Sequence, residues 1–430
     1  MSEDSFDAII VGAGIAGCVA GYVLADAGLE VLIIERGNYA GAKNMTGGRL
    51  YAHSLEKIMP GFAAEAPVER RVTHEKISFL TDDAAVTMEY GNAAGPDPEH
   101  ESYTVLRAEF DQWLLGKAEE AGAQPVPGVR VDELIVTDGK VTGVRAGDEI
   151  LEADVVILAD GVNSILGEQL GLVKRIEPRS AAVGAKELIE LPRGTIQERF
   201  GLVGDEGLAW LFAGAPSAGL MGGGFLYTNR DTLSLGVVCG LEGIEKASKS
   251  VPQMLEDFKC HPAVAPLVKD GKLIEYSGHL VPEGGFDMVP RLAAAGALIV
   301  GDAAGLCLNV GYTVRGMDLA VASAEAAALT VIEAKKSGDF SEAGLAGYRR
   351  RLEDSFVLRD MRLYKNMPAF LEGNPRMFAA YPQMAADIMK DMFVIGGEPQ
   401  KPVWRKLLAR CGQVGRLNLI KDVIKGVRSL

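Results

Sequence analysis

The sequence predicts an α/β fold in which a parallel sheet is interrupted by a mostly antiparallel sheet and followed by a helical region. Apolar, β-branched runs at residues 6–12 and 30–35 are typical of buried parallel strands. Residues 180–290 instead alternate short strand patterns with glycine turns. Beyond residue 338, helical patterns are separated by Pro and Gly breaks.

The first buried strand leads into a glycine-rich turn, and the turn residues are Gly12, Ala13, Gly14, Ala16 and Gly17. A helix and a second strand follow, and that strand ends at Glu35. In a Rossmann-type domain, the first glycine makes the turn, the second admits a pyrophosphate and the third packs the helix on the strand. The helix N-terminus favours phosphate. An acid at Glu35 can accept hydrogen bonds from a ribose, which favours FAD or NAD over NADP.

Two later buried strands also end in polar turns. One ends at Asp160 and Gly161, and the other at Gly301 and Asp302. Because the carboxyl ends of parallel strands share one edge of a sheet, we expect these turns and the glycine turn to face one ligand. Asp302 can bind hydroxyls of a ribityl-like linker, cap the turn that follows it, or do both.

Other segments are expected to complete the cofactor site. The long polar loop after Glu35 either crosses the cofactor or is simply solvated. Arg107, between a short strand and a helix, either contacts a phosphate or ribose or forms an ion pair. Arg315 either places a fixed charge near the cofactor ring or pairs with Asp318. The remaining predicted cofactor contacts are Arg36, Thr46, Gly47, Gly48, Val131, Asn309 and Gly311.

These patterns divide the chain into four parts. We predict the first part of the cofactor-binding domain at 1–179, an antiparallel sheet domain for a substrate or partner at 180–290, a return segment of the cofactor domain at 291–337, and a helical C-terminal region at 338–430.

The net charge and the cysteine content argue against some classes of partner and cofactor. The formal net charge of −14 argues against a nucleic-acid partner, which requires a basic surface. The five cysteines include no C-x-x-C pair, so the usual framework of an iron–sulfur cluster is missing, and we predict no metal site. With no signal peptide and no long apolar run, we expect a cytoplasmic protein, with peripheral attachment to the inner face of the membrane left open.

The motifs together resemble a known family. G-x-G-x-x-G followed by Glu35, then Leu106-Arg107, ADG and GDAAG resemble the FAD-dependent superfamily of p-hydroxybenzoate hydroxylase and geranylgeranyl reductase. Longer stretches, such as GLMGGGFLYTN and VGDAAGLCLN, resemble FixC-type flavoproteins, relatives of electron-transfer-flavoprotein:quinone oxidoreductase. The resemblance implies FAD as cofactor and electron-transferring flavoprotein subunits as partners. It also implies a small ferredoxin-like iron–sulfur protein, or a quinone at the membrane surface, as the other partner.

We therefore predict an FAD-dependent oxidoreductase that passes electrons between an electron-transferring flavoprotein and a quinone or ferredoxin-like partner. No protein side chain is assigned a catalytic role, because the flavin performs the redox chemistry. The alternative is an FAD-dependent reductase or monooxygenase with its own organic substrate, similar to a prenyl reductase or a hydroxylase. The lack of a second nucleotide motif weakens the hydroxylase alternative.

The last thirty residues are predicted to form a basic amphipathic helix. They contain eight Lys or Arg residues and one acid. Apolar residues recur every three or four positions at Val403, Leu407, Cys411, Val414, Leu417, Ile420, Ile424 and Val427. Either this helix packs on its own acidic body, or it docks on an anionic membrane or a small acidic ferredoxin-like partner.

Overall fold

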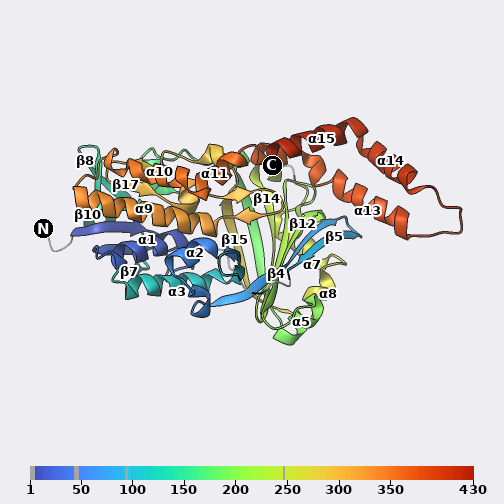
Figure 1. Cartoon of the computed structure of the whole chain (residues 1–430), viewed down its shortest axis with the longest axis horizontal. Helices are drawn as coiled ribbons and strands as arrows, with labels where there is room; N and C mark the ends of the chain where they lie inside the picture. The colour runs from blue at the N-terminus through green and yellow to red at the C-terminus, as the bar shows by residue number, and fades with distance from the viewer. Residues whose placement is uncertain (1–4, 43–47, 93–94, 96, 246) are drawn as a thin grey trace.

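The computed structural model describes residues 5–42, 48–92, 95, 97–245 and 247–430. The molecule is elongated (Figure 1). A parallel sheet with its helices lies at the N-terminal end, a second sheet lies in the middle, and a helical arm projects at the other end.

The first sheet is the predicted parallel one. Its parallel strands, in spatial order, are β17 (Ala297–Ile299), β10 (Glu149–Leu158), β1 (Ser5–Val11), β2 (Val31–Glu35) and β7 (Gln124–Pro127). The antiparallel strands β8 (Glu133–Thr137), β9 (Lys140–Ala146) and β16 (Ala293–Ala294) extend it. The helices α1 (Ile15–Asp26), α3 (Arg107–Glu120) and α9 (Met317–Ser337) pack together beside this sheet. Ile9, Ile33 and Val156 are fully buried, as continuous apolar strand runs predict.

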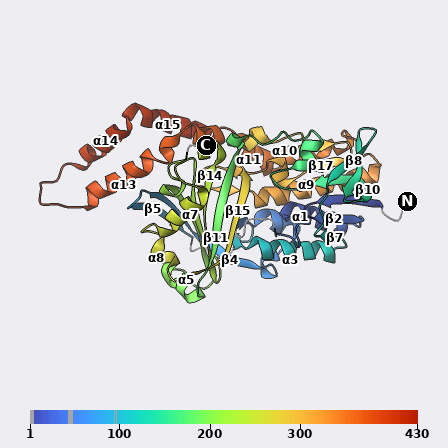
Figure 2. The ribbon, with the colours of Figure 1, turned by 180° about the vertical axis from the view of Figure 1, so that it is seen from behind.

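The second sheet is mostly antiparallel, as predicted. Its order is β15 (Lys272–Pro282), β11 (Ala181–Glu190), β14 (Thr232–Gly240), β13 (Gly222–Thr228), β12 (Glu206–Gly214), β4 (Val68–Leu80), β6 (Ser102–Val105) and β3 (Gly48–Tyr51), with β5 (Ala85–Gly91) paired to β4. Strands β3 to β6 precede residue 180, where we placed the start of this domain. They join the sheet through the parallel pairing of β4 with β12. Figure 2 shows β11 and β15 from behind, between the first sheet and the arm.

Short elements lie between the strands. Five helices lie between strands of the second sheet: α2 (His53–Ile58), α5 (Arg193–Phe200), α6 (Leu241–Ile244), α7 (Val251–Cys260) and α8 (Ala265–Val268). Helix α4 (Ile165–Gln169) lies between β10 of the first sheet and β11 of the second, and the strand pair β18 (Leu308–Asn309) and β19 (Val314–Arg315) follows β17.

The C-terminal region is helical, as predicted. Its helices are α10 (Gly347–Asp354), α11 (Phe356–Leu363), α12 (Met367–Glu372), α13 (Ala380–Phe393), α14 (Val403–Val414) and α15 (Arg416–Ser429). The prediction of one helix over the last thirty residues is wrong, because Gly415 adopts a φ of +88° and separates α14 from α15. In Figure 1, α13, α14 and α15 form the arm, and the connection from α13 to α14 lies at its far end. In the described part of the chain, no helix is long and apolar enough to cross a membrane.

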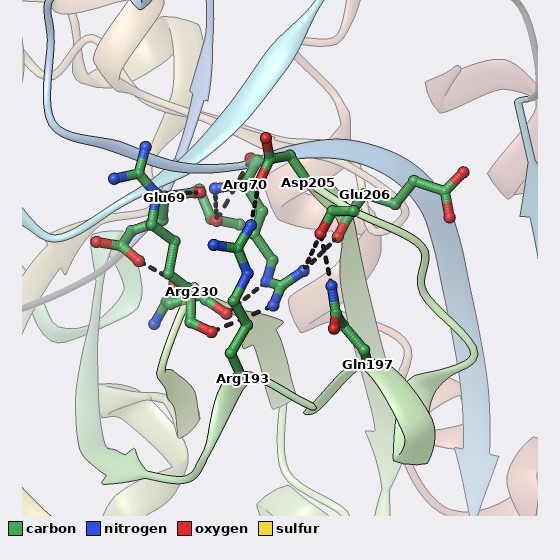
Figure 3. Close-up of polar contacts among 10 residues, drawn as sticks. Glu69, Arg70, Arg193, Gln197, Asp205, Glu206 and Arg230 are labelled. Carbon is green, nitrogen blue, oxygen red and sulfur yellow. Dashed lines mark hydrogen bonds and ion pairs between the residues drawn. The ribbon is translucent and has the colours of Figure 1, made fainter. Parts of the chain in front are cut away.

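A buried arginine holds one end of the second sheet together (Figure 3). Arg70, on β4, is 1% exposed. Its Nε donates to the Asn229 carbonyl at 2.5 Å and its Nη1 to the Glu206 carbonyl at 3.0 Å. Further bonds reach the carbonyls of Gly204 and Arg230, both at 3.2 Å. The guanidinium therefore joins β4 to the start of β12 and to the β13–β14 turn.

We expect Arg70→Met to destabilise the protein strongly, because each buried carbonyl left without a donor costs about 1–3 kcal/mol. The free energy of unfolding should fall by about 3 kcal/mol or more, measured by urea unfolding with tryptophan fluorescence. The neighbouring Arg193, whose ion pair with Asp205 is exposed, provides the control. Arg193→Met should cost less than about 1 kcal/mol. Equal losses for both variants would contradict a clamping role for Arg70.

Candidate functional site

A cavity of about 870 Å³ lies where the two sheets meet. The first sheet contributes the glycine turn after β1, Glu35 at the end of β2 and Asp160 after β10. The second sheet contributes Gly222–Gly224 of β13 and His279 of β15. One continuous cavity is therefore bounded by both halves of the fold.

The glycine turn has the tight packing that a dinucleotide site requires. Gly12 has a φ of +104°, and a Cβ there would lie 2.3 Å from the Ala159 carbonyl oxygen. A Cβ at Gly17 would lie 1.8 Å from the Gly12 oxygen. Gly14 is the N-cap of α1, has no side chain to cap the helix, and lines the cavity together with Ala16. The first turn of α1 therefore presents its amides to the cavity, where a phosphate would bind.

Glu35 braces this turn from β2. Its Oε2 accepts a hydrogen bond from the Ala13 amide at 2.8 Å, and its Oε1 accepts one from Gly37 at 2.5 Å. The side chain also lines the cavity, as does Arg36. The predicted contact of Glu35 with a ribose stays a prediction, whereas its hydrogen bonds to the glycine turn were not predicted from the sequence.

Asp160 supplies an acceptor without a partner. Its Oδ2 accepts from the Leu166 amide at 3.3 Å, whereas Oδ1 is buried with no hydrogen-bond partner among the described residues. Burial raises the pKa of this carboxyl to about 6. A buried acceptor of this kind calls for a donor, such as a ligand hydroxyl, and Gly161 lines the same part of the cavity.

Asp302 lies on the cavity wall in a short helical turn, Gly301–Ala304. Val300 is the N-cap of that turn, so the alternative that Asp302 caps it is wrong. Burial raises the pKa of Asp302, and the nearby Arg107 and His279 partly oppose that rise. Gly301 does not line the cavity; a Cβ there would lie 3.0 Å from the Ala16 Cβ, so it serves the packing of α1.

Arg107 forms an ion pair, which was one of its two predicted roles, and its predicted contact with a phosphate or ribose stays a prediction. Its Nε and Nη2 donate to the two carboxylate oxygens of Asp111 at 2.7 and 2.8 Å, and its side chain also lines the cavity. Burial disfavours the charge, but Asp111 outweighs burial and raises the pKa of Arg107. A permanent positive charge therefore stands in the cavity wall.

The other predicted contacts are distributed as follows. Gly48, Val131, Asn309 and Gly311 line the cavity, whereas Thr46 and Gly47 lie outside the described residues. Arg315 forms the ion pair with Asp318 that the sequence suggested as one alternative. It donates hydrogen bonds to Asp318 at 2.6 Å and to Asp360 at 2.7 Å. This pairing fixes the start of α9, where Gly316 and Met317 line the cavity.

Local sequence patterns did not predict the wall that the second sheet provides. Its polar side chains include Arg49, Tyr227, His279 and, directly after β15, Glu283, and its apolar side chains include Leu211, Phe212, Phe225 and Val238. Cys307, on the segment that follows β17, also lines the cavity. His279, Val281 and Glu283 stand at every second position of the sequence. This period-two spacing is the one local signal that could have placed these three residues on a common face.

Comparisons with known proteins agree with this architecture. A family model described as "FAD binding domain" matches residues 5–187, and one described as "ETF-QO/FixC family C-terminal domain" matches residues 367–430. The probable electron transfer flavoprotein-quinone oxidoreductase YdiS of Escherichia coli K12 is 61% identical over the full length of both chains. Protein FixC of the same strain is also 61% identical over the full length of both chains.

Solved structures show the same fold at low identity. A geranylgeranyl bacteriochlorophyll reductase-like protein from Thermoplasma acidophilum matches with a TM-score of 0.73 and 20% identity, covering 98% of this chain and 99% of that one. The flavin-dependent brominase Bmp2 matches with a TM-score of 0.64 and 17% identity, covering 96% and 100% of the two chains. The FAD-binding family model and the full-length relatives show that the cofactor of this chain is FAD.

We expect Gly14→Val to yield folded but colourless protein, because its side chain would occupy the path of the pyrophosphate. FAD binding should weaken by about a hundredfold or more, measured by flavin absorbance and equilibrium titration. Gly116→Val is the matched control, since nothing lies within 4 Å of a Cβ at that position on α3. A yellow, folded Gly14→Val protein would show that the pyrophosphate lies elsewhere.

Proposed function

The chain belongs to the ETF-QO/FixC family, and from that premise we propose that it passes electrons from a reduced electron-transferring flavoprotein, through FAD, to a quinone or a ferredoxin-like iron–sulfur protein. The observation that carries the proposal is the single cavity shared by the glycine turn and the second sheet. An acceptor on the second-sheet wall would share this cavity with the bound FAD.

The first-sheet wall of the cavity suits cofactor binding, and the second-sheet wall suits binding of the electron acceptor. We propose that the first-sheet residues described above hold FAD, with Asp160 and Asp302 accepting hydrogen bonds from its hydroxyls. When bound, FAD supplies the redox chemistry, and the chain supplies binding, orientation and electrostatics. The second-sheet wall is largely apolar, with Phe212, Phe225 and Val238 among its side chains. Such a wall favours an apolar, planar acceptor such as a quinone.

Iron–sulfur chemistry is assigned to a separate partner. Among the residues that the structure describes, no group of three or more His, Cys, Asp or Glu side chains is placed to hold a metal ion. The resemblance to FixC-type chains implies that a small ferredoxin-like protein brings the cluster.

We expect the bound flavin to be reduced rapidly by a reduced electron-transferring flavoprotein and slowly by NADH or NADPH. The physical reason is that an electron crosses between two docked flavins, whereas a hydride requires a second nucleotide site. Anaerobic stopped-flow absorbance measures both rates. Fast bleaching by a pyridine nucleotide alone would contradict the proposal and favour a reductase or hydroxylase with its own substrate.

We further propose that the protein is cytoplasmic and that the arm attaches it to the inner face of the membrane. At its far end, Phe393 and Ile395 are 76% and 75% exposed, and Trp404 is 58% exposed. The exposed apolar side chains of α15 are Leu417, Ile420, Val423, Ile424 and Val427. The arm is basic, and each Lys or Arg near an anionic membrane contributes about 1 kcal/mol.

Polar contacts hold the arm in place while leaving these apolar side chains free. Asp422 on α15 accepts hydrogen bonds from Arg376 at 2.6 and 2.7 Å and from Tyr381 at 2.5 Å. Arg410 on α14 donates to both carboxylate oxygens of Asp391 on α13, at 2.7 and 2.8 Å. Because ion pairs rather than apolar packing fix the helices, this arrangement favours docking over a helix packed on its own body.

We expect the double variant Phe393→Ser, Ile395→Ser to lose binding to vesicles that contain anionic lipid while keeping its FAD. Burial of two large apolar side chains contributes about 3 kcal/mol or more, so the partition coefficient should fall by about a hundredfold. Co-sedimentation with vesicles measures the change. Val203→Ser is the matched control, since Val203 is also 76% exposed but lies after α5. Unchanged sedimentation of the double variant would contradict docking through the arm tip.

A further inference from the structure

Glu283, at the end of the second-sheet wall, is a partly buried carboxyl without an ion-pair partner among the described residues. His279 and Val281 lie near the end of β15, Glu283 directly follows the strand, and all three line the cavity. Antiparallel pairing with β11 fixes this segment, with His279 opposite Gly184 and Val281 opposite Ala182. The Glu283 amide donates to the Ser180 carbonyl at 2.8 Å, which holds the backbone just beyond the strand.

A neutral amide orients the Glu283 carboxyl. Asn309 Nδ2 lies 3.4 and 3.2 Å from the two carboxylate oxygens of Glu283. Asn309 Oδ1 in turn accepts from the Gly311 amide at 2.9 Å, so the amide group of Asn309 is held with its NH₂ toward Glu283. Among the described residues, no Lys, Arg or His nitrogen lies within ion-pair distance of Glu283.

The surrounding titratable groups come from several elements. Cys307 and Asp302 lie on the segment that follows β17, His279 lies on β15, and Arg107 lies on α3. Cys307 is partly buried, and desolvation, together with the negative charges of Glu283 and Asp302, raises the pKa of its thiol. Burial also lowers the pKa of His279, with Asp302 opposing and Arg107 reinforcing that shift.

The proposed reaction needs protons in this cavity. Reduction of a quinone to a quinol consumes two electrons and two protons, and electrons that arrive from a protein donor bring no protons. We propose that Glu283 is the carboxyl that delivers protons to an acceptor of the quinone class in this cavity. This inference rests on the function proposed above.

Each transfer is balanced. The O–H bond of the Glu283 carboxyl breaks, a new O–H bond forms on one carbonyl oxygen of the acceptor, and water returns a proton to the carboxylate. Two such transfers, with two electrons from the reduced cofactor, convert the two carbonyls of the quinone into the two hydroxyls of the quinol.

The acidity of the site fits this task. Burial raises the pKa of Glu283 to about 7, and the hydrogen bond from Asn309 partly opposes the rise. The protonated form therefore predominates below about pH 7 and is lost as the pH rises through that value. Quinone reduction that depends on this proton should slow over the same interval.

The test compares Glu283→Gln with the wild type and with Asp287→Asn. Gln keeps the size of the side chain and can accept from Asn309, but it cannot release a proton. Asp287 is exposed, follows Glu283 closely in the chain and does not line the cavity. Flavin content and thermal stability should be unchanged in both variants.

Two readouts decide the proposal. Redox-difference infrared spectra of the wild type and of Asp287→Asn should contain a carboxylic C=O band that shifts in D₂O, and Glu283→Gln should lack it. Single-turnover reduction of a water-soluble short-chain quinone should be about a hundredfold slower in Glu283→Gln and should lose the decline around pH 7.

Different negative results would contradict the role of Glu283 and the choice of quinone as acceptor. An unchanged infrared band in Glu283→Gln, or a wild-type rate and pH profile in that variant, would overturn the assignment of Glu283. Failure of the wild type to reduce any quinone, despite reduction by an electron-transferring flavoprotein, would overturn quinone as the acceptor. The infrared comparison would then still decide whether Glu283 exchanges a proton during the redox cycle.

Discussion

The structure depends on how closely the turn after β1 packs against the end of β10. Gly12 leaves no room for a Cβ beside the Ala159 carbonyl, and Gly17 leaves none beside Gly12. This contact brings the first turn of α1 to the same edge as Asp160 and Asp302. The amides, the carboxyls and the charge of Arg107 thereby lie around one cavity, in which we propose that FAD binds.

The second sheet gives the cavity a different chemical character. Its long strand β4 pairs with β5 and β6, which follow it closely in the chain, and with the distant β12, and Arg70 fixes it to β12 and to the β13–β14 turn. The resulting wall is apolar except for a few partly buried titratable groups, among which Glu283 is held by Asn309. We therefore propose that the first sheet holds the cofactor and the second shapes the acceptor side, while the arm presents apolar side chains outward.

Local sequence patterns predicted the first sheet well because a glycine turn, a buried strand and a terminal acid are short-range signals. Gly14, Asp160 and Asp302 were found in this way, and all three line the cavity. The second-sheet wall was missed because it depends on pairing between distant strands, such as β4 with β12, which no local pattern encodes. The break at Gly415 was missed because the apolar spacing continues across it, although the backbone there requires a positive φ.

The central claim is that cofactor and acceptor share one cavity between the two sheets. An experimental structure of the yellow protein with a short-chain quinone analogue tests it most directly. The account predicts pyrophosphate density at the start of α1, with the flavin ring and the analogue between the glycine turn and the Glu283 wall. Density for the analogue outside this cavity, or for a flavin ring turned away from the second sheet, would contradict it.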